Sequence, residues 1–190
     1  MILIPDKCIW VNTPRTGSQT IAKCAKRDGL WVHRKHHPPK DEIPYDLMLP
    51  VWTIIRPPFE QMLSWYSAHT AAPTEKGFIK FVESKQTAMG WDSERRLNPY
   101  YDITNKFFLY GENGEGIYLA LREMGLSALK YRLIPHEGKG LTKKLDHLKT
   151  PEMYDLVVEN YSADQHLYEE VQSNQRLPGP HLNSGRLHLP

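Results

Sequence analysis

The run of residues 51–55, VWTII, constrains the fold of this chain more than any other feature. It carries no charge and is rich in β-favouring residues, which is typical of a central parallel strand covered on both faces. Arg56 ends the run, and Pro57-Pro58 then suits the first turn of a helix, where a missing N–H costs nothing. The segment therefore predicts a strand, a turn and a helix in succession.

A second unit of the same kind lies near the start of the chain. Residues 7–13 predict a buried strand, the turn PRTGSQT follows at once, and a helix continues to Arg27, where Asp28-Gly29 ends it. Because strands alternate with helices, we expect one α/β domain over residues 1–190, with a mainly parallel central sheet flanked by helices. In such sheets, ligands bind beyond the carboxyl ends of the strands.

The remaining sequence predicts short elements. Thr150-Pro151-Glu152 has the cap, the proline and the carboxylate of a helix start. Residues 106–110 form an apolar run before a glycine-rich turn. Further helices are expected near residues 59–66, 78–82 and 117–123, and further strands at 30–33 and 130–135.

Composition limits the class of protein. Hydrophobic residues make up 40% of the chain and charged residues 24%, as in ordinary globular domains. A formal net charge of +2 is too small to favour nonspecific nucleic-acid binding. Cys8 and Cys24 have no metal-ligand spacing and are expected to be reduced core thiols. No apolar stretch has the length of a membrane span or signal peptide, so a cytoplasmic protein is expected, although an anchored enzyme without its anchor would look the same.

The first candidate site is the strand-to-helix turn around Gly17. Free N–H groups and the positive end of the helix favour an anion there, Gly17 permits close approach, and Arg15 adds a charge. A capped helix start with a surface arginine is the alternative. The single glycine, with no lysine before a hydroxyl, excludes a Walker A motif and disfavours nucleoside triphosphate chemistry. The predicted binding residues are Pro14, Arg15, Thr16, Gly17, Ser18, Gln19 and Thr20.

The second candidate site combines Arg56, at the end of the VWTII strand, with Ser64 eight residues later. This spacing puts the serine in the second turn of the next helix, so that both side chains can converge on one phosphate. The alternative is a strand-end charge and a solvent-facing helix serine.

PRTGSQT after a strand, together with IIRPP and a serine eight residues after its arginine, resembles the PAPS-dependent sulfotransferases, especially their carbohydrate and tyrosylprotein branches. PAPS is 3′-phosphoadenosine 5′-phosphosulfate. The resemblance implies a P-loop NTPase-like sulfotransferase fold, a loop that binds the 5′-phosphosulfate, and a 3′-phosphate site at Arg56 and Ser64. Segments at Asn98-Pro99, 161–168 and 180–184 look like other parts of this family. Arg15 stands where many members have lysine, and Gln19 where a small hydroxyl residue is usual.

The family implies transfer of a sulfuryl group to an acceptor hydroxyl, releasing PAP without a metal. A glycan or small-molecule acceptor is favoured by family branch, and selectivity is expected from residues 70–101. His37 is the first candidate for the base, because it precedes Glu42-Ile43 at a spacing that is similar in the carbohydrate branch. His36, His33 and Glu42 remain alternatives, as does a loop that only attracts an anionic acceptor.

Three further points stay open at the level of sequence. Arg186 is expected to close over the 3′-phosphate, the alternative being a frayed surface end. The chain could instead be a nucleotide-binding module that has lost transfer, or a divergent P-loop kinase that needs ATP and Mg²⁺. The sequence predicts no oligomeric state.

Overall fold

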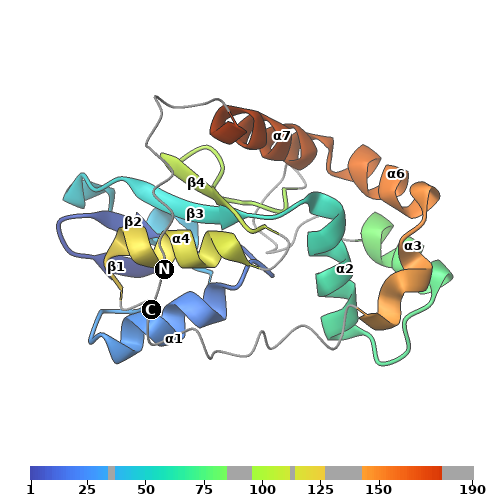
Figure 1. Ribbon diagram of the computed structural model, residues 1–190, viewed down its shortest axis with the longest axis horizontal. Helices are drawn as coiled ribbons and strands as arrows, with labels where there is room; N and C mark the ends of the chain where they lie inside the picture. Colours follow the sequence, from blue (N-terminus) through green and yellow to red (C-terminus); the bar gives the residue numbers. More distant parts are fainter. Residues whose placement is uncertain (34–36, 85–95, 112–113, 127–142, 177–190) are drawn as a thin grey trace, which may run out of the picture.

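A computed structural model describes residues 1–33, 37–84, 96–111, 114–126 and 143–176 (Figure 1). A four-stranded open sheet lies at its centre, in the order β1-β2-β3-β4. β2 pairs with β3 and β3 with β4 in parallel, whereas β1 pairs with β2 antiparallel. The strands are β1 (Ile2–Ile4), β2 (Cys8–Trp10), β3 (Val51–Ile55) and β4 (Lys106–Leu109). The mainly parallel α/β sheet expected from the sequence is confirmed.

Helices flank this sheet, and most begin where the sequence predicts. The helix after β2 is α1 (Ser18–Arg27), and the helix after β3 is α2 (Pro58–His69). Both units therefore have the predicted order of strand, turn and helix. The other α-helices of the described residues are α3 (Glu75–Ser84), α4 (Glu115–Met124), α6 (Pro151–Asn160) and α7 (Ser162–Arg176). Short 3₁₀ helices lie at Lys40–Glu42, Tyr45–Leu47 and Lys143–Leu148.

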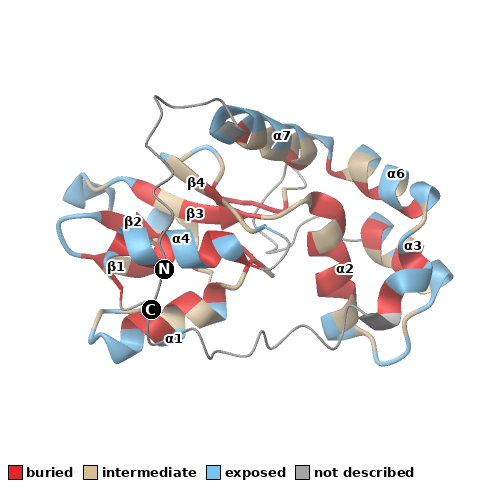
Figure 2. Cartoon of the chain, in the orientation of Figure 1, coloured by how far each residue is buried: buried red, intermediate tan, exposed pale blue. Residues whose placement is uncertain are grey.

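The two faces of the sheet are buried in different clusters, as the alternation of side chains along a strand requires. Trp10 and Ile54 face a core shared with α1 and α4, which includes Ile21 and Ile117. Ile9 on the opposite face packs with residues that include Val11, Ile43 and Tyr100. This double covering explains why β2 and β3 are mostly buried (Figure 2) and carry no charged residue.

A third apolar cluster lies away from the sheet, among α2, α3 and α6 (Figure 1). Met62 and Leu63 from α2 meet Phe78 from α3 and Val157 from α6. α2 is buried along most of its length because it contacts both this cluster and the turn that follows β2. It therefore links the helical part of the molecule to the carboxyl ends of the parallel strands.

Several sequence predictions differ from the structure. β1 was not expected, and it forms because residues 2–4 pair with β2 across a tight turn. Residues 30–33 make only an isolated bridge between Val32 and Ile2. The strand expected at 130–135 lies outside the described residues.

Cys8 and Cys24 are buried thiols, as predicted, and burial raises the pKa of Cys8 to about 12. None of the described helices is both long enough and apolar enough to cross a membrane.

Candidate anion-binding site

Parallel pairing of β2 and β3 places both predicted motifs at the same edge of the sheet. The register pairs Trp10 with Trp52, and the Val11 amide donates to the Trp52 carbonyl at 2.9 Å. Beyond this pair, the Thr13 hydroxyl donates to the Ile54 carbonyl at 2.5 Å. The Thr53 hydroxyl donates in return to the Val11 carbonyl at 2.9 Å. These buried bonds fix the start of the first turn against the end of β3.

The turn after β2 has an unusual backbone. Arg15 has a φ of 60°, a left-handed conformation that residues other than glycine rarely adopt. Gly17 has a φ of 79° and forms the N-cap of α1. A Cβ at Gly17 would lie 2.2 Å from Ile117 Cδ1, so any other residue would have to displace that side chain and adopt a conformation that favours glycine. The turn is therefore packed closely against the start of α4.

The predicted hydroxyl ligands of this turn do not share one environment. Thr16 is buried, and its hydroxyl donates to the Thr13 carbonyl at 2.9 Å. Ser18 is buried as well, whereas Thr20 is half-buried and Gln19 is exposed. The Thr16 hydroxyl thus stabilises the turn itself. The first turn of α1 receives no side-chain cap at Gly17 and contains no acidic residue.

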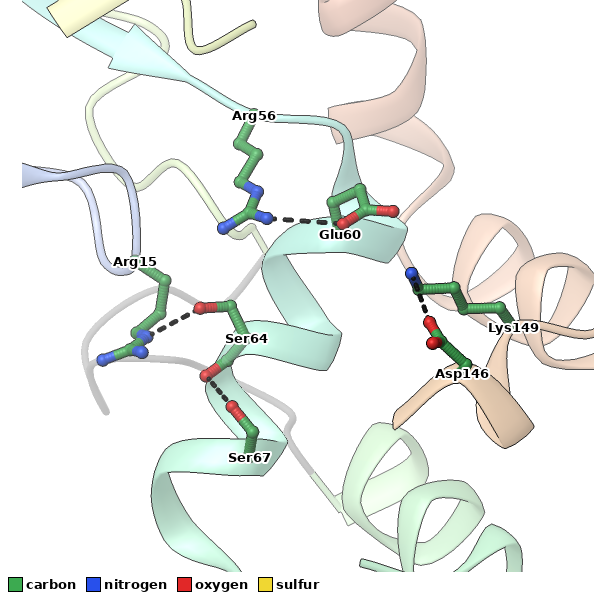
Figure 3. A network of polar contacts seen from close by, with 7 residues as sticks. All are labelled: Arg15, Arg56, Glu60, Ser64, Ser67, Asp146 and Lys149. Atoms are coloured by element: carbon green, nitrogen blue, oxygen red, sulfur yellow. Dashed lines mark hydrogen bonds and ion pairs between the residues drawn. The ribbon is translucent and has the colours of Figure 1, made fainter. Parts of the chain in front are cut away.

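Arg15 joins the first motif to the second. Its Nε donates to the Ser64 Oγ at 3.1 Å, across 49 residues of sequence (Figure 3). Burial lowers the pKa of Arg15, and the nearby charge of Arg56 lowers it further. The two guanidinium groups therefore repel each other, and an anion between them would remove that repulsion.

Arg56 has two other neighbours. Its Nη2 lies 3.3 Å from the Glu60 Oε2, and its guanidinium lies 4.8 Å from the centre of the Tyr110 ring. We predicted that Arg56 and Ser64 share one phosphate, but here the serine contacts Arg15 and the arginine contacts Glu60 (Figure 3). The spacing brings both residues to the site, and their joint contact with a phosphate stays a prediction.

We compared the chain with family models, curated proteins and solved structures. No match was found. The residues of the site are therefore the basis for any functional proposal.

His37 lies beside the end of β2. Its Nδ1 is 2.5 Å from the carbonyl oxygen of Asn12, which can only accept, so Nδ1 carries the proton in this contact. A neutral ring then has its lone pair on Nε2. The next residue, Pro38, accepts a 2.8 Å hydrogen bond from the buried Tyr100 hydroxyl. The Asn12 contact thus favours the tautomer with the proton on Nδ1, and the Tyr100 bond holds the backbone beside His37.

The other candidates for the base have different surroundings. The His33 Nε2 lies 3.4 Å from the Glu42 Oε2, so these two candidates contact each other. His36 and Arg186 lie outside the described residues. Across the described ranges, no group of three His, Cys, Asp or Glu side chains is arranged to hold a metal ion.

Two residues of the site were missed at the level of sequence. Tyr110 follows β4, the third parallel strand, and its ring contacts Arg56. The sequence could have indicated Tyr110, because it ends a predicted apolar run and ligands bind beyond the carboxyl ends of parallel strands. Gln61 is 3% exposed in α2, and its Nε2 donates to the Pro14 carbonyl at 2.8 Å. In the sequence, Gln61 stands out as a polar residue among the apolar residues of its helix. That feature points to a site only once the side chain is known to be buried.

Proposed function

We propose that this chain is a PAPS-dependent sulfotransferase with a P-loop NTPase-like sulfotransferase fold. It transfers the sulfuryl group of PAPS to an acceptor hydroxyl and releases PAP. The observation that carries the proposal is the Arg15–Ser64 contact at the shared edge of β2 and β3. It joins the two motifs whose combination resembles this family.

Positive charge at the site supports an anionic substrate. Arg15 and Arg56 come from separate turns, and the charge of Arg56 lowers the pKa of Arg15. α1 begins at the same place without a side-chain cap, and the start of a helix favours anions. In the proposed complex the turn after β2 holds the 5′-phosphosulfate, and Arg56 with Ser64 holds the 3′-phosphate.

The proposed reaction is an in-line displacement at sulfur. The acceptor oxygen attacks sulfur while the bond from sulfur to the bridging phosphate oxygen breaks, and PAP leaves with that electron pair. Arg15 and the amides of the turn stabilise the negative charge on the leaving phosphate. Arg15 acts through its charge and its N–H donors and not as an acid, because a guanidinium does not give up its proton in this pH range.

His37 is the proposed base. With Nδ1 donating to the Asn12 carbonyl, Nε2 takes the proton of the acceptor hydroxyl. The resulting imidazolium keeps the Asn12 contact, because both ring nitrogens are then donors. Glycans are the acceptor class we propose to test first, followed by tyrosyl peptides and small alcohols.

A direct assay tests the proposal. The protein is incubated with PAPS labelled in its sulfuryl group and the acceptor panel, with EDTA present, and sulfated product is measured. We expect labelled product and the release of PAP. PAP binding without product for any acceptor would favour a binding module that has lost transfer, and phosphorylated product with ATP and Mg²⁺ would favour a kinase.

A further inference from the structure

The backbone of Arg15 needs support from elsewhere in the molecule. Its φ of 60° is unfavourable for an L-residue with a side chain, so neighbouring contacts must hold it there. The side chain of this same residue is directed at the Ser64 hydroxyl. Backbone and guanidinium are therefore coupled, because a change of the Arg15 backbone moves the Cα–Cβ bond and with it the charged group.

Gln61 is placed to provide that support. Its Nε2 donates at 2.8 Å to the carbonyl of Pro14, and that carbonyl belongs to the peptide group that carries the Arg15 amide. Gln61 is 3% exposed, so this bond is shielded from water. Fixing the carbonyl fixes the plane of the peptide from which Arg15 φ is measured.

The same side chain contacts a second segment. The Nε2 of Gln61 lies 3.5 Å from the Leu97 carbonyl, and the Asp164 carboxylate of α7 accepts the Leu97 and Asn98 amides at 2.9 and 3.0 Å. Two carbonyl acceptors call for a group with two N–H donors, which an amide has and an ionised carboxylate does not. This explains a glutamine, rather than a glutamate, at the buried position.

One turn further along α2, Ser64 accepts from Arg15 Nε at 3.1 Å. Residues three apart lie on one face of a helix, so Gln61 and Ser64 contact the turn from the same side. We infer that Gln61 is a positioning residue, which holds the Pro14–Arg15 peptide so that the Arg15 guanidinium meets the bound anion. The inference rests on the proposed function only for the identity of that anion.

A double-mutant cycle tests this role. PAP affinity is measured by calorimetry for the wild type, Gln61→Met, Arg15→Ala and the double variant, each corrected for its folded fraction. Methionine removes both donors at similar volume. We expect Gln61→Met to weaken PAP binding about threefold to tenfold, the value of one hydrogen bond, and to have no further effect once Arg15 is alanine.

A control at a second glutamine tests whether the effect depends on position. Gln175 also donates from its side chain to a backbone carbonyl, that of Phe107 at 3.1 Å, but it is exposed and lies on α7. Gln175→Met should leave PAP affinity unchanged. If Gln61→Met does not fold, Gln61→Asn, which keeps the amide but shortens its reach, replaces it in the cycle. Failure of both to fold would make Gln61 a stability residue and overturn the inference.

The cycle is run with PAP and with pyrophosphate, so that the two proposals can fail separately. Coupling between Gln61 and Arg15 with pyrophosphate, but no PAP binding by the wild type, would overturn the proposed function and support the role of Gln61. PAP binding with equal losses in both Arg15 backgrounds would overturn the role of Gln61 alone. Binding of neither probe would overturn both.

Discussion

The starts of α1 and α6 differ in how the first amides of the helix are capped. The first amides of any helix lack partners within the helix. At α6, Thr150 accepts from the Met153 amide, Pro151 occupies the first turn, and Glu152 adds a carboxylate. The pKa of Glu152 is lowered by hydrogen bonds from its own amide and from Thr150. The chain thus supplies its own acceptors and negative charge at this helix start.

At α1 the Thr20 amide donates to the backbone carbonyl of Gly17 at 3.0 Å, but the chain supplies neither a side-chain cap nor a carboxylate. Gly17 occupies the N-cap without a side-chain acceptor, the first turn has no acidic residue, and the neighbouring Arg15 is a cation. The turn is nevertheless packed closely, because Gly17 lies against Ile117 and Thr16 is buried. The difference supports the proposal that a ligand supplies negative charge at the start of α1, whereas the chain itself caps the start of α6. Four substitutions test this contrast.

The largest expected effect concerns His37, which lies against the Asn12 carbonyl after β2. His37→Ala should reduce turnover by about 10²–10⁴-fold with little change in PAP affinity, because it removes the proposed general base. The wild-type rate should fall as the pH drops and the imidazole becomes protonated, and this limb should be absent in the variant. Steady-state rates across a pH series measure both effects.

The alternatives for the base have defined outcomes in the same assay. Near-normal turnover in His37→Ala with collapse in Glu42→Ala, His33→Ala or His36→Ala would move the role to that residue. Near-normal turnover in all four would mean that this loop only attracts the acceptor.

The next effect concerns the charge at α1. Arg15→Ala should weaken PAP binding by about 10–100-fold, because hydrogen bonds to charged groups are worth about 1.5–3 kcal/mol. Stability should be preserved, since removing one guanidinium also relieves its repulsion with Arg56. Calorimetry and thermal melting of the same samples measure the two quantities. Unchanged PAP affinity would contradict the contrast between the two helix starts.

A smaller effect is expected from Ser64→Ala, which removes the neutral acceptor of Arg15. PAP affinity should fall by about threefold to tenfold, less than for Arg56→Ala, because a charge-assisted bond is roughly twice as strong as a neutral one. Ser67→Ala is the matched control, since the Ser67 hydroxyl donates along the helix, to the Ser64 carbonyl at 2.9 Å. Equal losses in the two serine variants would show a general effect on α2 and would argue against a site at Ser64.

The smallest effect, and the converse of the Arg15 result, concerns α6. Thr150→Ala should lower the free energy of unfolding by about 1 kcal/mol, the usual cost of losing an N-cap, and leave PAP affinity unchanged. Chemical denaturation and calorimetry test both parts. A loss of PAP affinity here would show that the two helix starts are not separate in function.

Local chemistry was enough to predict much of the fold from the sequence. Residues 51–55 form β3 because an unbroken β-favouring run has few alternatives. Thr150-Pro151 begins α6 because a cap and a proline act within one turn of helix. The turn between β2 and α1 was predicted for the same reason. In each case, the physical cause lies within a few residues of its effect.

Contacts between distant segments decided the rest. Nothing near Ser64 in sequence indicates that its partner is Arg15, 49 residues away, while the nearer Arg56 contacts Glu60. Gln61 became part of the site only when α2 packed against the turn after β2. The sequence alone determined which segments are strands, turns and helices, because those preferences are local. Only the tertiary structure decided which side chains meet, because that depends on how the parallel strands align and on which face α2 turns toward them.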